Sequence, residues 1–298
     1  MEDIKKEHTR IVFIINPHSG RSSKKDLEEN IYSIFPALLY EVSIKYTEYK
    51  NHASELSRKA LNEKADIIVA VGGDGTINEV ASQIIDTECI LGIVPAGSGN
   101  GLARHLGISR VKSKALKKIR KGKTIKIDTA SINNTAFVSI AGLGFDALVA
   151  DKFSRSKSRG FFSYFKIIAE NYPKYRPKKY IIQIDEDTTI TTRALFLSFA
   201  NSNQFGYNTA IAPHAKLNDG KLDLCIVKKP YLIEIPLIAN LLLLKKIHLS
   251  PFVSIIPVRN IIVKQSKNRV VNIDGEAMKL GKELDIRTNP LSLNVLIP

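Results

Sequence analysis

The chain has 298 residues, which at about 150 residues per domain predicts two domains. An apolar content of 44% excludes a disordered chain, while 44 Lys and Arg against 29 Asp and Glu leave a net charge of +15. Cys89 and Cys225 are the only cysteines, which excludes a disulfide framework and a paired-cysteine metal site. The longest apolar run falls far short of the ~20 residues of a membrane-spanning helix, and the start MEDIKKEHTR lacks a signal-peptide core. We therefore expect a basic, cytoplasmic protein.

Apolar runs alternate with helical patterns over the first 125 residues. Four runs predict strands, at 10–16, 40–46, 67–71 and 90–94. Between them apolar residues recur three and four positions apart, as in Leu27, Ile31 and Ile34, which predicts helices. Strands that alternate with helices form a parallel sheet with right-handed crossovers. We therefore predict an α/β domain over residues 1–125.

Basic residues gather in two segments at and beyond the end of this domain. Residues 110–126 contain nine Lys or Arg and no acid, and residues 152–179 contain nine with one acid, Glu170. Such a surface suits nucleic acid, anionic lipid head groups or a polyphosphate, and net charge does not choose among them. A solvated protein face without any partner is the alternative.

From about residue 127 the pattern changes to β-branched runs separated by turn residues. The runs that predict strands are 136–141, 180–184, 189–200, 221–227, 260–264, 269–273 and 291–297. Only 161–172 and 232–244 have a helical pattern. Short consecutive strands without intervening helices predict an antiparallel sheet or sandwich. Residues 126–286 are therefore predicted to form a mostly-β second domain.

Three loops that follow predicted strands are rich in glycine. They are 16–20 (NPHSG), 72–76 (GGDGT) and 97–101 (GSGNG). Ligands bind at the carboxyl ends of parallel strands, where glycine lets backbone N–H groups converge beside a helix N-terminus. A tight turn explains any one of these loops, but three at neighbouring strand ends predict a polyphosphate site. A GxGxxG-like segment at 142–147 lacks the following parallel strand, so we expect no dinucleotide site there.

Two acidic positions have open alternatives. Asp74 lies where the phosphates are expected, and Mg²⁺ would neutralise it there, but an Asx turn or helix cap is its other role. Asp274-Gly275-Glu276 follows a predicted strand. A carboxylate there could act as a general base, whereas a type I′ hairpin turn explains Asp-Gly equally well.

The motifs together resemble the catalytic domain of diacylglycerol kinases and sphingosine kinases, particularly the soluble bacterial lipid kinases. The similarity rests on GGDGT with Asn78 and Glu79, on PAGSGN at 95–100 and on DGE at 274–276, and it covers nearly the whole chain. GGDG alone is shared with NAD kinases. The resemblance implies an α/β domain that binds ATP, to which residues 287–298 return, and a β-sandwich domain that presents the lipid and the base.

The resemblance also implies roles for particular residues. The expected ATP contacts are Asn16, Ser19, Gly20, Thr47, Gly72, Gly73, Asp74, Gly75, Thr76, Asn78 and Ser98. Glu276 is the implied general base, with Asp74 and Asp274 as further catalytic residues, and Asp74 is an implied Mg²⁺ ligand. A second Mg²⁺ is implied at a turn of the second domain, held by the Asp219 carboxylate and by the Lys216 and Lys221 carbonyls. Many relatives have an acid where this chain has Asn218.

We therefore expect an ATP- and Mg²⁺-dependent kinase that phosphorylates the primary hydroxyl of a lipid alcohol, with diacylglycerol the expected acceptor and phosphatidate the product. A sphingoid base or another lipid, NAD, and a non-catalytic role on membranes or nucleic acid are the alternatives. The DGE motif and the Ser-Gly-Asn loop favour a lipid kinase over an NAD kinase, and a non-catalytic role leaves the glycine loops unexplained.

The expected partner besides the lipid is an anionic membrane surface, bound peripherally and reversibly, and not nucleic acid. The basic segments would supply charge, and residues 232–244 would supply either an interfacial apolar face or a core helix. A homodimer is left open.

Overall fold

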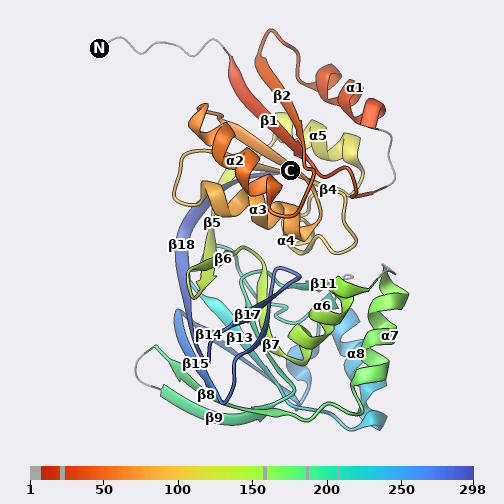
Figure 1. Ribbon diagram of the computed structural model, residues 1–298, viewed down its shortest axis with the longest axis vertical. Coiled ribbons are helices and arrows are strands. Elements are labelled where there is room, and N and C mark those ends of the chain that lie inside the picture. The colour runs from red at the N-terminus through yellow and green to blue at the C-terminus, as the bar shows by residue number, and fades with distance from the viewer. Residues whose placement is uncertain (1–7, 21–23, 157–159, 186–187, 207–208) are drawn as a thin grey trace. The chain divides into compact units, whose positions relative to one another are not determined.

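The computed structural model describes residues 8–20, 24–156, 160–185, 188–206 and 209–298 (Figure 1). The chain divides into two compact units, Met1–Ile127 with Ser292–Pro298 and Asp128–Leu291. Residues 157–159 of the second basic segment lie outside the described residues. Within the described residues, no helix is both long enough and apolar enough to cross a membrane.

The first unit contains a parallel sheet in the order β2-β1-β3-β4-β18. Its strands are β1 (Thr9–Ile15), β2 (Tyr40–Tyr46), β3 (Ile67–Gly72), β4 (Ile90–Pro95) and the end of β18 (Glu283–Ile297). The last pairing is made by Asn294 and Val295, which lie opposite Ile90 and Leu91. All of these pairings are parallel, which confirms the predicted α/β class.

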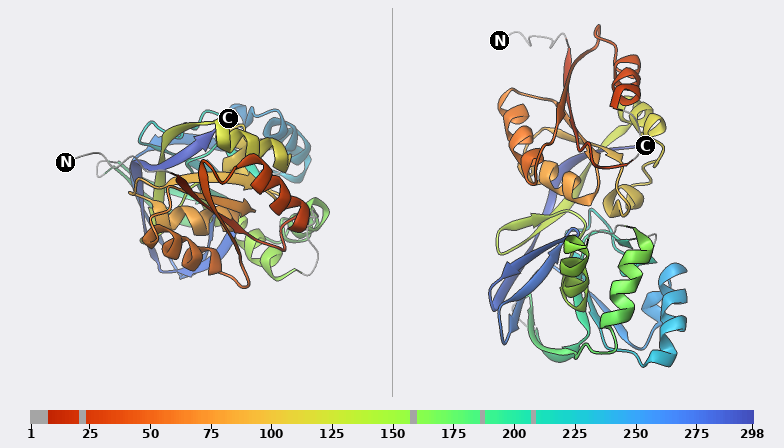
Figure 2. Two further views of the ribbon diagram at one scale, coloured as in Figure 1. Left: turned by 90° about the horizontal axis from the view of Figure 1, so that it is seen from above. Right: turned by 45° about the vertical axis from the view of Figure 1, so that its right-hand side comes forward.

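Helices cover both faces of this sheet, α2 and α3 on one and α1 and α5 on the other (Figure 2). The helices of the unit are α1 (Lys24–Ile34), α2 (His52–Asn62), α3 (Asp74–Ile84), α4 (Gly101–His105) and α5 (Lys112–Lys121). In α3 the buried residues include Ile77, Val80, Ala81 and Ile84, which follow the helical period. Because β1, β3 and β4 are buried on both faces, their sequences are almost continuously apolar.

The second unit is a sandwich of two antiparallel layers. One layer has the order β14-β13-β10-β7-β16-β17, and the other contains β9, β8, β15 and the first part of β18, with β5 and β6 beside it. The first layer consists of β7 (Ile140–Gly144), β10 (Phe196–Ala200), β13 (Leu222–Val227), β14 (Val253–Val258), β16 (Arg269–Ile273) and β17 (Glu276–Leu280). The second uses β5 (Lys123–Ile132), β6 (Thr135–Phe137), β8 (Lys178–Ile184), β9 (Thr188–Ala194) and β15 (Asn260–Gln265). Side chains of both layers, such as Phe199 and Tyr180, form one buried core, which confirms the predicted β-sandwich.

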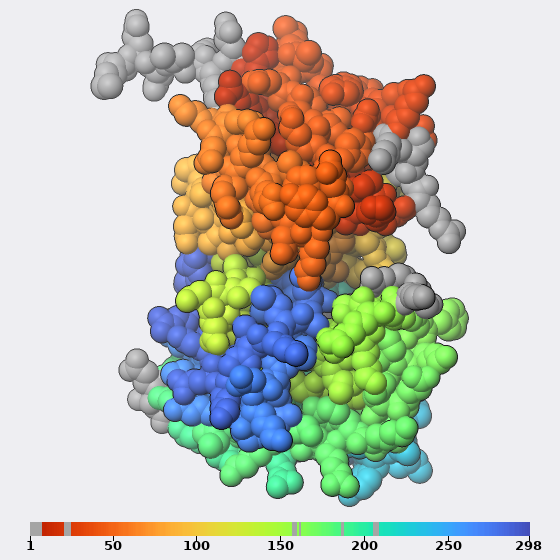
Figure 3. All heavy atoms as spheres, in the orientation of Figure 1, coloured from red at the N-terminus to blue at the C-terminus, as the bar shows by residue number. Residues whose placement is uncertain are grey.

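Helices cover the other face of the six-stranded layer. They are α6 (Phe145–Arg155), α7 (Phe161–Asn171) and α8 (Ile235–Leu243), with short 3-10 helices η1 (Leu232–Glu234) and η2 (Ile247–Leu249) beside α8. These elements contribute to a second apolar cluster against that sheet face. Figure 3 shows α6 and α7, in green, at the surface of the unit.

The expectation of two helices in this half was wrong, because α6 is a third. Its buried residues begin directly at Phe145, Asp146 and Ala147, so no polar N-cap separates the helix from β7. Gly144, with a φ of 95°, makes the turn instead. The sequence around this junction therefore looks like one strand followed by a glycine-rich loop.

Two of the predicted strands are each two strands in the structure. Residues 189–200 divide at Leu195 into β9, with alternating exposure, and β10, buried throughout, and the two belong to different sheets. Residues 136–141 divide between β6 and β7. The short strands β11 (Gln204–Gly206) and β12 (Thr209–Ala210), as well as β5, β14 and β17, were not predicted. Continuous β-branched composition hides a change of sheet, because each part satisfies the strand pattern by itself.

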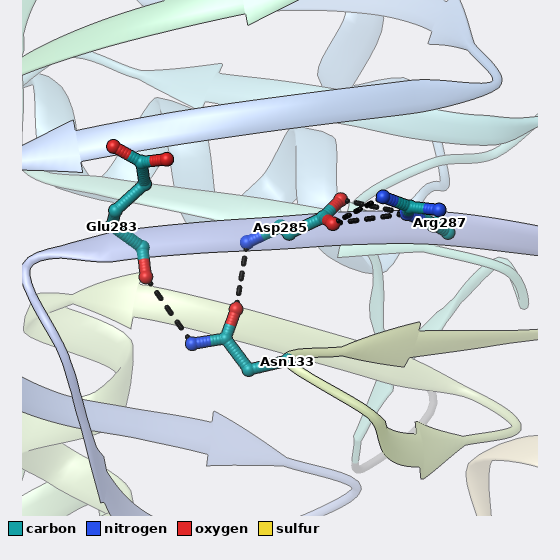
Figure 4. A network of polar contacts seen from close by, with 4 residues as sticks. All are labelled: Asn133, Glu283, Asp285 and Arg287. Carbon is teal, nitrogen blue, oxygen red and sulfur yellow. Dashed lines mark hydrogen bonds and ion pairs between the residues drawn. The ribbon is translucent and has the colours of Figure 1, made fainter.

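Asn133, in the left-handed turn between β5 and β6, fixes that turn to β18 (Figure 4). Its Nδ2 donates to the Glu283 carbonyl at 3.2 Å, and its Oδ1 accepts the Asp285 N–H at 2.7 Å. The Asp285 carboxylate pairs with Arg287 at 2.7 Å. The amide of Asn133 therefore replaces a pair of strand-to-strand hydrogen bonds at the point where the hairpin reverses.

Asp128 is a buried carboxylate that holds two turns of the second unit. Its Oδ2 accepts the Gly220 N–H at 2.7 Å, and its Oδ1 accepts the Leu291 N–H at 2.8 Å. Gly220 and Leu291 both have left-handed φ values, of 69° and 48°. The carboxylate therefore stabilises two backbone conformations that the chain does not favour by itself.

Replacing Asp128 with Ala should lower the free energy of unfolding by about 2–5 kcal/mol, because two backbone N–H groups lose their acceptor. Urea unfolding followed by circular dichroism measures this. Glu170→Ala is the control, since its surface pair with Lys166, at 3.9 Å, should contribute less than about 1 kcal/mol. Equal stability of the two variants would contradict the role given to Asp128.

Candidate functional site

Two of the glycine loops touch each other directly in the first unit. A Cβ atom on Gly97 would lie 2.5 Å from the Gly73 Cα, so this approach requires glycine at position 97. The Ala96 and Gly97 N–H groups both donate to the Gly72 carbonyl, at 2.8 and 3.2 Å. The loops after β3 and β4 therefore form a single backbone structure.

Asp74 joins the same two loops through its side chain. Its Oδ2 accepts the Asn100 N–H at 2.8 Å and its Oδ1 accepts the Gly101 N–H at 2.7 Å, so it caps the start of α4. Burial raises the pKa of Asp74, although these two bonds and the nearby charge of Arg104 act in the opposite direction. The sequence suggested a local Asx turn or helix cap, but the N-cap of α3 is Gly73, and Asp74 caps α4 across the two loops instead. The role of Asp74 as a Mg²⁺ ligand stays a prediction.

Asn100 closes the loop after β4 upon itself. It has a left-handed φ of 56°. Its Oδ1 accepts the Gly97 N–H at 3.2 Å, and its Nδ2 donates to the Gly97 carbonyl at 2.6 Å. The loop therefore has a fixed shape in which Ser98, at its tip, is exposed.

The loop after β1 lies beside the start of α3. The Asn16 Nδ2 donates to the Thr76 Oγ1 at 3.4 Å, while the Asn16 Oδ1 accepts the His18 N–H at 2.9 Å. Thr76 in turn covers Gly72, where a Cβ atom would lie 2.5 Å from the Thr76 Oγ1. The structure thus brings Asn16, Gly72 and Thr76 together.

The other expected ATP contacts also lie in the first unit. Thr47 follows β2 and donates its N–H to the Ile15 carbonyl at 2.9 Å. Ser19 and Gly20 lie in the loop after β1, and Gly75 and Asn78 lie in the first half of α3. Helix α3 begins at Asp74, and the first N–H groups of a helix lack acceptors within the helix, so its N-terminus beside the loops is suited to bind anions. This arrangement is suited to an anion with several phosphate groups.

In the second unit, Asp274 and Gly275 form the two-residue turn between β16 and β17. Their φ values are 46° and 90°, and Ile273 lies opposite Glu276, so the hairpin interpretation is confirmed. Glu276 is half-buried at the first position of β17.

The Asp274 carboxylate is buried and accepts three backbone N–H groups. These belong to Val138, Ser139 and Ile140, at 2.8, 2.9 and 2.8 Å. Such contacts favour a positioning role for Asp274, which holds the turn that presents Glu276. The catalytic roles of both residues stay predictions.

The turn expected to hold a second Mg²⁺ is exposed at Lys216, Asp219 and Lys221. The Asp219 Oδ1 accepts the Lys221 N–H at 3.1 Å. Asp223, which the sequence analysis missed, lies close enough that the charge of Asp219 adds to burial in raising the pKa of Asp223. Within the described ranges, no three His, Cys, Asp or Glu side chains are grouped to hold a metal. The metal role of this turn stays a prediction.

An apolar cavity of about 510 Å³ lies between the six-stranded sheet and the helices of the second unit. Its walls include Phe165 and Ile168 of α7, Leu232 of η1, and Ile238 and Leu242 of α8. The helical periodicity of 161–172 and 232–244 indicated these walls, but without α6 the sequence did not predict a cavity.

Among the residues that the structure describes, Asp146 is the only acid in the wall of this cavity. It is buried in the first turn of α6, and its Oδ2 accepts the Asn272 Nδ2–H at 2.8 Å. Burial raises the pKa of Asp146 to about 6, while the bond from Asn272 lowers it by less. A Cβ atom on Gly142 would collide with this carboxylate, so glycine leaves the space that Asp146 occupies. The neighbours of β7 are antiparallel, so this glycine motif does not open a dinucleotide-binding βαβ unit.

The pKa of Asp146 is higher in the folded chain than in the unfolded chain, so protonation of Asp146 favours folding. This stabilisation is fully present below the unfolded pKa of about 4, and it is lost as the pH rises through the folded pKa of about 6. The unfolding free energy of the wild type should therefore decrease between pH 4 and pH 7, and in Asp146→Asn this decrease should be smaller by up to about 3 kcal/mol. Urea unfolding at several pH values measures it. Asp151→Asn, at a partly exposed position of the same helix where the side chain pairs with Arg155, is the control and should retain the wild-type slope. An unchanged slope in Asp146→Asn would contradict the raised pKa.

Comparisons with known proteins cover both units. Residues 10–132 match the family model described as "Diacylglycerol kinase catalytic domain", and residues 136–297 match the model described as "YegS C-terminal NAD kinase beta sandwich-like domain". A protein of Bacillus subtilis (strain 168) named diacylglycerol kinase is 32% identical over 90% of this chain and 89% of its own. One of Staphylococcus epidermidis with the same name is 29% identical over 91% and 86%. A crystal structure of a diacylglycerol kinase from Bacillus anthracis str. Sterne has a similar fold, with a TM-score of 0.76, 19% identity, and coverage of 99% and 98%.

Proposed function

The chain belongs to the diacylglycerol kinase family, and on this premise we propose that it transfers the γ-phosphoryl group of ATP to the primary hydroxyl of diacylglycerol. The resemblance drawn from the sequence motifs is confirmed, as is the assignment to kinases with an alcohol acceptor. ATP, Mg²⁺ and the particular lipid are part of the proposal.

The glycine loops support ATP as the donor. Phosphoryl transfer depends mainly on positioning and on charge neutralisation, which preformed backbone N–H groups supply without reorganisation. The contact between Gly73 and Gly97 and the two bonds to Asp74 hold these loops in one conformation.

The donor set near the loops fits Mg²⁺ bound together with a nucleotide. Mg²⁺ is commonly held by one or two carboxylates plus substrate phosphates, and Asp74 is the carboxylate at the loops. When bound, the ion would neutralise charge on the phosphoryl oxygens. Since both Asp74 oxygens already accept backbone bonds, we propose loop positioning as the first role of Asp74 and metal binding as the second.

The apolar cavity is the observation that most directly supports a lipid as the acceptor. The described residues of its walls are mainly aliphatic and aromatic and include a single acid, a lining suited to acyl chains attached to a small polar group. NAD would bring two phosphates and two riboses into a lining that is almost entirely apolar. We therefore place the acyl chains in the cavity, with the polar group of the lipid toward Asp146.

The test is transfer of label from γ-labelled ATP to lipids in mixed micelles. We expect a chloroform-soluble product with diacylglycerol and less with a sphingoid base or phosphatidylglycerol. Label that enters only water-soluble product when NAD is supplied would contradict the proposal and favour an NAD kinase.

Glu276 is the proposed general base that accepts the proton of the lipid hydroxyl. Glu276→Gln should lower kcat about 10²–10⁴-fold at unchanged thermal stability, because a general base contributes about that factor. Glu283→Gln is the matched control, since its surface pair with Lys264, at 3.4 Å, lies outside the proposed site. If Glu276→Gln keeps kcat within about threefold, the assignment of the base is wrong.

An exposed apolar surface on α7, η1 and α8 supports docking on a membrane. We call it the α7–α8 surface, and it consists of Phe162, Phe165, Tyr231, Leu232, Ile233, Leu237, Leu243 and Leu244, each 57–88% exposed. The opposite side of α8 packs in the core through Ile235 and Ile238. One face of α8 is thus a core face, and the interfacial role of its exposed face is part of the proposal.

The α7–α8 surface continues into the cavity. Phe165, Leu232 and Leu243 are exposed and also line the cavity wall. Lys245 and Lys246 follow α8 and are exposed, and each Lys near anionic head groups contributes about 1 kcal/mol to binding. We propose that this surface inserts shallowly into an anionic membrane, so that a lipid enters the cavity from the bilayer.

Ile233→Glu should weaken sedimentation with phosphatidylcholine–phosphatidylglycerol vesicles and lower activity on diacylglycerol in those vesicles. Ile233 is 88% exposed, so the fold should be kept, and activity on a short-chain, water-soluble diacylglycerol should be unchanged. Leu38→Glu, at an equally exposed leucine of the first unit, is the control. If vesicle binding of the wild type is unchanged by about 0.5 M salt, the proposed attraction between the lysines and anionic head groups is contradicted.

A further inference from the structure

Lys112, the first residue of α5, places its ammonium group beside the glycine loops. A Cβ atom on Gly20 would lie 3.5 Å from the Lys112 Nζ and 3.4 Å from the Ala96 carbonyl oxygen. Gly20 ends the loop after β1, and Ala96 begins the loop after β4. The ammonium group therefore lies where these two loops meet, next to a glycine with a left-handed φ of 83°.

The surroundings of Lys112 differ from those of its basic neighbours in α5. Lys114, Lys117 and Lys118 are exposed, whereas Lys112 is half-buried, and burial lowers the pKa of Lys112. The helix gives no reason for a cation here, because the helix dipole disfavours positive charge in the first turn.

A second cation, Arg104, also contacts these loops. The Arg104 Nε donates to the Gly99 carbonyl at 2.8 Å, so its guanidinium lies against the loop after β4. Burial and the positive charge of Arg110 both lower the pKa of Arg104, whereas Asp74 raises it. The Arg104 guanidinium and the Lys112 ammonium thus both approach the loops, an arrangement that a polyanion would stabilise.

We propose that Lys112 binds the β- and γ-phosphates of ATP, as a donor that none of the glycine motifs contains. The assignment rests on the proposed function, because it takes the loops to be the ATP site. An ammonium group binds phosphate as a compact charge with three N–H donors and would neutralise charge that backbone N–H groups only partly balance. Part of the positive charge of residues 110–126 is then directed to the nucleotide rather than to the membrane.

The same chemistry would also suit a phospholipid head group, so the experiment distinguishes the two. Calorimetric titration of the full chain with ATP and with inorganic triphosphate compares wild type, Lys112→Ala, Lys112→Arg and the control Lys59→Ala, an exposed lysine of α2. Lys112→Ala should bind ATP and triphosphate about tenfold more weakly or worse, with unchanged binding of adenosine. Lys112→Arg should recover most of the affinity, and Lys59→Ala should match wild type.

Wild-type affinity of Lys112→Ala for both ATP and triphosphate would overturn the assignment. The assignment would also be overturned if Lys112→Ala lost binding to phosphatidylglycerol vesicles but kept its affinity for ATP. Lys112 would then be a contact for lipid head groups. If the wild type binds ATP and triphosphate but phosphorylates no lipid, the proposed acceptor fails while the lysine result stands. Failure of the wild type to bind either nucleotide or triphosphate would overturn both.

Discussion

The contact between the loops after β3 and β4 is the constraint on which the proposed nucleotide site depends. Gly97 lies against the Gly73 backbone, and Asp74 accepts N–H groups of Asn100 and Gly101 on either side of its carboxylate. Without a glycine at 97 the loops could not approach, and without the carboxylate the start of α4 would lose two acceptors. The conformation of the proposed phosphate site is thus fixed by the chain itself, which is how preorganised sites reduce the cost of binding.

Buried aspartates also hold the backbone in place elsewhere in the chain. Asp274 accepts three N–H groups and holds the hairpin that carries Glu276, and Asp128 accepts two and holds the turns at Gly220 and Leu291. Each carboxylate fixes backbone that has left-handed residues or reverses direction. Asp74 and Asp274, for which the sequence motifs suggest catalytic roles, therefore first of all hold the backbone in position. Glu276, which is half-buried and lies just beyond such a turn, is the acid that we propose as the general base.

Much of the fold could be predicted from the sequence, and the reasons for the failures are physical. Strands such as β1 and β3 are apolar because both faces are covered, and glycines at strand ends marked the loops. Helix α6 was missed because it starts at Phe145 without a polar cap, and the cavity was missed with it. Lys112 was counted in a charged run, since only the folded chain brings it beside Gly20. Spacing along a sequence does not report contacts between segments that are 92 residues apart, as at Asp128 and Gly220.

The most direct test of this account is calorimetric titration of ATP into wild type and Asp74→Asn, first with EDTA and then with Mg²⁺. If the carboxylate holds the loops, Asp74→Asn should bind ATP at least about tenfold more weakly in EDTA, because one backbone N–H then faces an amide donor. This loss would occur although the substitution removes a negative charge from beside the phosphates. Equal or tighter binding in EDTA, with a defect only when Mg²⁺ is present, would contradict the account and make Asp74 a metal ligand alone.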